Sequence, residues 1–115
     1  MSQHRTPYQQ VRQIDYAIGR FGAAINLDEQ SPAARKSFEI LRRNSRRSLD
    51  VLKDYEMLEL EEDILKQAKA LPKAVKSLSV LRESLLKASE YDLISAIDVA
   101  QLSVEIDELI SGFGH

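Results

Sequence analysis

The chain of 115 residues contains no cysteine, and its two histidines, His4 and His115, stand at the two ends. Without cysteine there is no disulfide, no zinc–thiolate site and no thiol catalysis. Without an internal histidine, the serines lack a base for a Ser–His–Asp triad, and the carboxylates lack the Glu-x-x-His pairs of di-metal bundles. We therefore expect a protein that is not an enzyme and that holds no cofactor and no metal.

Glycine, proline and long apolar runs are also scarce. There are four glycines and three prolines, and no apolar run approaches the ~20 residues needed to span a bilayer. The first ten residues lack the apolar segment of a signal peptide. The formal net charge of −2 gives no overall attraction to nucleic acid or acidic lipid. We expect one cytoplasmic domain without a membrane segment.

Helical periodicity fills most of the chain and predicts an all-α fold with apolar stripes at coiled-coil spacing. Thr6-Pro7 and Ser31-Pro32 each place an N-cap residue before a proline at the first helical position, which is a typical helix start. Leu71-Pro72 marks the next boundary, because proline disfavours a helical conformation in the residue before it. These signals predict helices at about 7–26, 32–70 and 73–110.

Two polar segments are candidate breaks in the long helices. Residues 44–48 are all polar, and residues 89–92 resemble a helix start, so that a kink there would give four helices instead of three. Two glycines lie beside the apolar stripe of the first helix. Gly19 and Gly22 either leave room for a close neighbouring helix or, for Gly22, simply weaken the helix end.

Charged residues form matched blocks on either side of Pro72. Residues 35–53 carry seven bases and two acids, and residues 54–63 carry six acids and no base. Beyond Pro72 the signs invert, with four bases and one acid in 73–89 and six acids without Lys or Arg in 90–115. If the chain folds back at Pro72, each block faces a block of opposite charge. The pattern predicts a long antiparallel helical hairpin with the N-terminal helix packed on it.

The N-terminal helix is about half as long as either hairpin arm and covers only half of the apolar face. The remaining tip half, residues 54–90, has more apolar surface than a two-helix seam needs, and large exposed apolar patches are uncommon on monomers. We therefore expect an elongated molecule whose tip packs on a second copy as a homodimer. The alternative is a break near residues 54–60 that closes a monomeric bundle. The candidate self-association residues are Leu58, Ile64, Leu65, Leu78, Leu81 and Leu85.

A run of four arginines within residues 42–47 is the sharpest polar candidate. One interpretation is a solvated face that pairs with Asp98 and Glu105 on the antiparallel arm. The other is a contact with phosphates or with an acidic protein, although no aromatic residue is interleaved to stack on bases. The four residues are Arg42, Arg43, Arg46 and Arg47.

These features together predict a protein–protein interaction module, a small regulator, adaptor or inhibitor that presents helical faces to a protein partner. The alternative is a nucleic-acid-binding regulator that uses the four arginines of residues 42–47.

Overall fold

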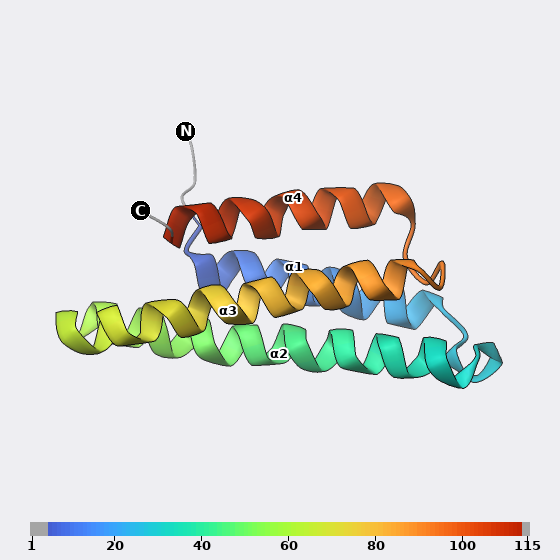
Figure 1. The fold of residues 1–115 in the computed structure, drawn as a ribbon, viewed down its shortest axis with the longest axis horizontal. Coiled ribbons are helices and arrows are strands. Elements are labelled where there is room, and N and C mark those ends of the chain that lie inside the picture. Colours follow the sequence, from blue (N-terminus) through green and yellow to red (C-terminus); the bar gives the residue numbers. More distant parts are fainter. Residues whose placement is uncertain (1–4, 114–115) are drawn as a thin grey trace.

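The computed structural model describes residues 5–113, and it confirms the all-α prediction over that range (Figure 1). Two helices, α2 and α3, form an antiparallel pair; α1 lies behind this pair and α4 runs alongside α3. The Cα atoms extend over 49 × 32 × 20 Å. The elements are α1 (Pro7–Ala24), the short 3-10 turn η1 (Leu27–Glu29), α2 (Pro32–Leu60), α3 (Ile64–Ser89) and α4 (Ala96–Phe113).

The predicted starts of the first two helices are confirmed by their hydrogen bonds. The hydroxyl of Thr6 accepts from the backbone N–H of Gln9 at 3.2 Å, and the Gln9 side chain accepts from the Thr6 N–H at 3.0 Å. The hydroxyl of Ser31 likewise accepts from the N–H of Ala34 at 3.1 Å. Each cap satisfies backbone donors that have no partner within the first helical turn.

The hairpin turn lies at residues 61–63, so the predicted turn at Pro72 and the helix bounds that followed from it are wrong. Helix α2 ends at Leu60, at the edge of the alternative break predicted near residues 54–60. Pro72 is exposed and lies inside α3. The turn is made by Glu62, with a positive φ of 56°, and by Asp63, whose side chain accepts from the N–H of Lys66 at 3.1 Å. This position gives arms of 29 and 26 residues that pair along nearly their whole length. The missing N–H of an exposed proline costs less than an unpaired apolar arm would.

Of the two candidate breaks, only the second is present. Helix α2 runs through residues 44–48 because Ser45 and Ser48 point into the bundle, where both are fully buried. The Ser45 hydroxyl donates to Asp15 of α1 at 2.8 Å, and the Ser48 hydroxyl donates to the carbonyl of Ser77 in α3 at 3.1 Å. Small side chains whose hydroxyls are hydrogen-bonded thus take the place of apolar side chains at these helix contacts. The chain does break after Ser89, which makes four α-helices within residues 5–113.

Helices α1 and α2 approach closely at the two glycines of α1. A Cβ at Gly22 would lie 2.8 Å from the ring of Phe38, and a Cβ at Gly19 would lie 2.6 Å from a guanidinium nitrogen of Arg42. The glycines therefore leave room for the neighbouring helix, the first of the two interpretations. At the other end of the bundle, the rings of Tyr55 and Phe113 meet edge to face at 5.3 Å.

Candidate functional site

The end of the α2–α3 hairpin projects beyond α1 and α4 (Figure 1). Large apolar side chains are exposed at this end. We call this cluster the apolar tip. Neither α1 nor α4 reaches far enough along the hairpin to cover it. The side chains that form it are Met57 (48% exposed), Leu60 (78%), Ile64 (75%) and Leu65 (79%).

The candidate self-association residues separate into two groups in the structure. Ile64 and Leu65 lie in the apolar tip, and Leu58 is half-buried beside them. The other three are fully buried in the core and offer no surface to a partner. The reason is the position of the turn: with the fold-back at 61–63, the middle of α3 faces the inside of the bundle instead of the hairpin end. These three core residues are Leu78, Leu81 and Leu85.

Carboxylates surround the apolar tip. The six acids of residues 54–63 all lie at this end of the hairpin, and Lys66 and Lys69 are the bases nearest to them in the first turns of α3. One of these acids, Asp63, has its carboxylate 3.8 Å from the ammonium of Lys66, and Glu56 accepts from the backbone N–H of Tyr8 at 3.2 Å. Within residues 5–113, no three Asp, Glu or His side chains converge in a way that could hold a metal ion.

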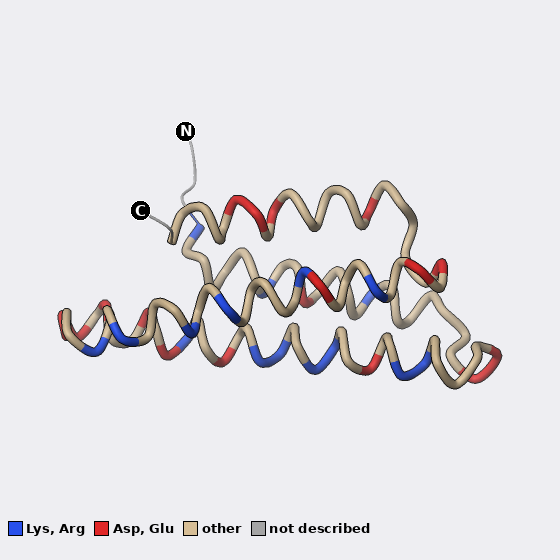
Figure 2. The backbone as a smooth tube through the Cα atoms, in the orientation of Figure 1, with Lys and Arg blue, Asp and Glu red and all other residues tan. Residues whose placement is uncertain are grey.

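The fold-back at 61–63 also changes which charged blocks are neighbours. Basic segment 35–53 now lies beside basic segment 73–89, as the hydrogen bond from Ser48 to Ser77 requires, and not beside an acidic block. Figure 2 shows Lys and Arg along both α2 and α3 over this stretch. The prediction that opposite charges face each other across the hairpin is therefore wrong for residues 35–53, the longest charged block.

A groove of about 370 Å³ runs between α2 and α3 within this basic stretch, and we call it the basic groove. Three exposed cations, Arg47, Lys73 and Lys76, stand along it. No acidic side chain lines it. Its remaining lining residues are Asn44, Val51, Ser77 and Val80.

The arginines of residues 42–47 differ in how far they are buried. Arg42 packs over Gly19 and is half-buried, whereas Arg43, Arg46 and Arg47 are exposed. None of the four forms an ion pair with a described carboxylate, and in particular none pairs with Asp98 or Glu105 as one interpretation expected. The basic α2 block faces α3 instead, and it is Arg82 of α3 that reaches a carboxylate of α4, with Nε 2.9 Å from Oδ1 of Asp107.

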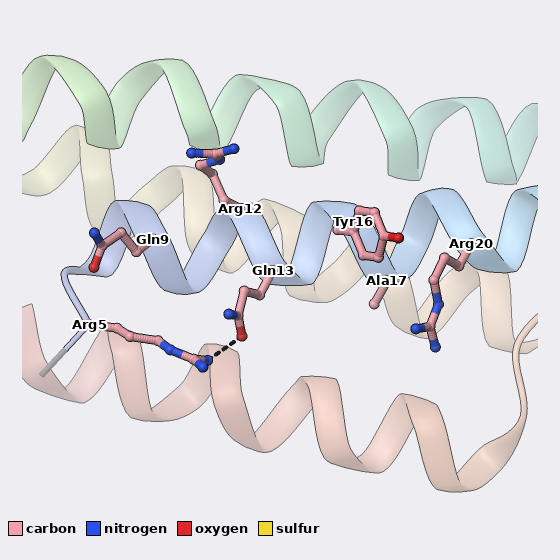
Figure 3. Close-up of a pocket in the computed structure, with 7 residues that line it drawn as sticks. All are labelled: Arg5, Gln9, Arg12, Gln13, Tyr16, Ala17 and Arg20. Atoms are coloured by element: carbon pink, nitrogen blue, oxygen red, sulfur yellow. Dashed lines mark hydrogen bonds between the residues drawn. The ribbon is translucent and has the colours of Figure 1, made fainter. Parts of the chain in front are cut away.

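A second basic hollow, of about 740 Å³, follows the outer side of α1 (Figure 3). Two of its three cationic side chains, Arg5 and Arg20, have partners within the hollow. Arg5 donates to the Gln13 side chain, and the Arg20 guanidinium lies 5.9 Å from the centre of the Tyr16 ring. In Figure 3 these side chains lie along the helix surface and do not converge on a common point. The arrangement resembles a solvated helix face more than a ligand pocket.

Sequence reasoning missed one surface, the outer face of α4. Ile97 is 80% exposed and Val104 is 55% exposed, one above the other at a spacing of seven residues. The helix contains four acids and no Lys or Arg, so it is both apolar and acidic. The sequence carries the signal for this surface, since the segment of α4 has apolar residues on more than one face of the helix.

No described helix combines the length and the apolar character that crossing a membrane would require. Comparison with protein-family models, curated proteins and solved structures found no match to this chain.

Proposed function

We propose that this protein is an interaction module without catalytic activity, and that the apolar tip is its binding surface for a partner protein. The observation that carries the proposal is the exposure of four large apolar side chains, between 48% and 79%, at the projecting end of the hairpin. Full burial of one such side chain contributes ~1.5–3 kcal/mol. Four of them supply enough free energy for a specific but reversible complex once the cost of association is subtracted.

The acids around the tip indicate what kind of partner fits. A partner that offers an apolar helical face bounded by Lys or Arg would match both the apolar centre and the acidic surroundings. Two tips facing each other would instead bring two sets of six acids together. A homodimer through the tip remains a prediction, and we expect added salt to strengthen it because salt screens this repulsion. In either case the protein would act as a small regulator, adaptor or inhibitor.

The test is a double variant, Ile64→Ser/Leu65→Ser, compared with Tyr16→Ser. Both variants remove apolar side chains that are at least 69% exposed, so both should fold as the wild type does by circular dichroism. A photo-crosslinking amino acid placed at Met57, beside the altered positions, would report partner contact in the native host.

We expect the adduct to form with wild type and with Tyr16→Ser, and to be lost in Ile64→Ser/Leu65→Ser. Light scattering of the purified proteins shows whether the partner is a second copy. An adduct that persists in the double variant would refute the proposal that the tip is the binding surface.

A further inference from the structure

The basic groove is an unusual place to leave positive charge without compensation. Segments 35–53 and 73–89 together hold eleven Lys or Arg and three acids, and the hairpin places the two segments side by side. Like charges on neighbouring helices repel each other. In the described part of the chain, Arg47, Lys73 and Lys76 have no carboxylate within ion-pair distance. A negatively charged partner in this groove would therefore reduce the repulsion between these cations and stabilise the folded chain.

The groove is not purely electrostatic, because it has apolar residues between its cations. Val51 of α2 and Val80 of α3 line it, and both are half-buried in the isolated chain. It also lies away from α1. Phe38 of α2 contacts α1 at Gly22, and Arg47 follows Phe38 by nine residues. Nine residues are two and a half turns of helix, so Arg47 lies on the side of α2 opposite to α1. The groove is thus open on the side that the rest of the bundle leaves uncovered.

The outer face of α4 has the complementary composition. Ile97 and Val104 form an exposed apolar row, and Glu105 and Glu108 stand beside it. The row from Ile97 to Val104 spans seven residues, ~10 Å at ~1.5 Å per residue, and the α2 side of the groove from Asn44 to Val51 spans the same seven residues. One surface is apolar and acidic, the other apolar and basic, and they have the same length.

We propose that α4 of one copy docks in the basic groove of a second copy, so that the chain self-associates head to tail. The apolar row of α4 covers Val51 and Val80, and its carboxylates meet Arg47, Lys73 and Lys76. Because the two surfaces differ, each copy keeps a free groove at one end and a free α4 at the other. Such a heterologous contact builds rings or open chains, not closed twofold dimers. It is separate from the apolar tip and does not depend on the function proposed for it.

Nucleic acid fits the groove less well than α4 does. The groove has no aromatic side chain on which a base could stack, and its two valines offer nothing to a phosphate. The net charge of the chain is −2, which would oppose binding to a polyanion beyond the groove itself. The hollow on α1 is a weaker site for α4, since its Arg5 and Arg20 are already engaged with Gln13 and Tyr16.

The experiment uses two charge-changing variants of the full chain. Lys73→Glu/Lys76→Glu alters the groove, and Ile97→Lys/Val104→Lys alters α4; all four side chains are exposed, so the fold should be unaffected. The matched control, Arg12→Glu/Arg20→Glu, reverses two exposed charges on α1. Sedimentation velocity at 20 mM and 500 mM NaCl, over a range of protein concentrations, measures the size of the species formed.

We expect wild type and the α1 control to form species that grow with concentration at low salt, and to associate at least ~tenfold more weakly at high salt. Each of the other two variants should remain a monomer alone. Mixed together they should form a dimer at least, because the intact α4 of the groove variant can dock in the intact groove of the α4 variant, a contact that neither variant can make alone. The tip variant Ile64→Ser/Leu65→Ser should associate as wild type does, which separates this proposal from the proposed function.

Two results would overturn the proposal. One is a wild-type chain that stays monomeric at all concentrations in low salt, or a mixture of the two variants that forms no dimer. The other comes from fluorescence anisotropy with a labelled 20-nucleotide DNA: binding by a monomeric wild type that is lost in Lys73→Glu/Lys76→Glu would assign the groove to nucleic acid.

Discussion

The contact between α1 and α2 predicts that an alanine at Gly22 destabilises the protein, against the usual effect of Gly→Ala in a helix. The new Cβ would lie 2.8 Å from two ring carbons of Phe38, closer than such atoms approach in proteins. The ring is 3% exposed and belongs to the core, so it has no free space to move into. Overpacking of this kind costs ~1–3 kcal/mol.

The helix propensity of alanine offsets part of that cost. Alanine is favoured over glycine by ~0.8–1.0 kcal/mol in a helix interior, but less near an end. Gly22 is two residues from the end of α1 at Ala24, so the gain there is smaller. We therefore expect Gly22→Ala to lower the free energy of unfolding by ~1–2 kcal/mol.

Gly19 provides the matched control on the same helix. A Cβ at Gly19 would meet only the guanidinium end of Arg42, at 2.6 Å, and that flexible side chain can swing into solvent. We expect Gly19→Ala to raise the free energy of unfolding by ~0.5–1 kcal/mol, which is the ordinary propensity gain.

Urea denaturation followed by circular dichroism at 222 nm measures both changes. In a double-mutant cycle, Phe38→Leu should relieve the penalty at Gly22 and leave the effect at Gly19 unchanged. Equal stabilisation by both alanines would refute the close approach of α1 and α2 at Gly22, and with it the packing that positions α2.

Two further experiments test other parts of the fold. Pro72→Ala should raise the free energy of unfolding by ~2–3 kcal/mol in urea denaturation, because the gain from restoring an N–H inside α3 exceeds the loss of proline's restriction of the unfolded chain; a loss of stability would indicate that the chain turns at this proline after all. The Tyr55→Ala and Phe113→Ala changes should be coupled by ~0.5–1.5 kcal/mol in a thermal-denaturation double-mutant cycle, since the two rings meet edge to face. Additive effects would show that the end of α4 is not held against α2 in solution.

The sequence alone determined the features that depend on a few neighbouring residues. The caps at Thr6 and Ser31 were predicted correctly because each side chain bonds an N–H three residues away, whatever the rest of the chain does. The helical class followed from periodicity in the same local way. The exposure of Ile64 and Leu65 was also anticipated, although for a hairpin with a different turn.

The turn position and the charged surfaces were decided only in the tertiary structure. The charge blocks suggested a turn at Pro72, but an exposed ion pair contributes ~0–1 kcal/mol, whereas burying one leucine contributes ~1.5–3 kcal/mol. Apolar pairing of α2 with α3 therefore set the register, and it buried Leu78, Leu81 and Leu85 while leaving Arg47 beside Lys73. Apolar packing thus determined which charged residues became neighbours, and for that reason a basic groove lies where the sequence had predicted matched ion pairs.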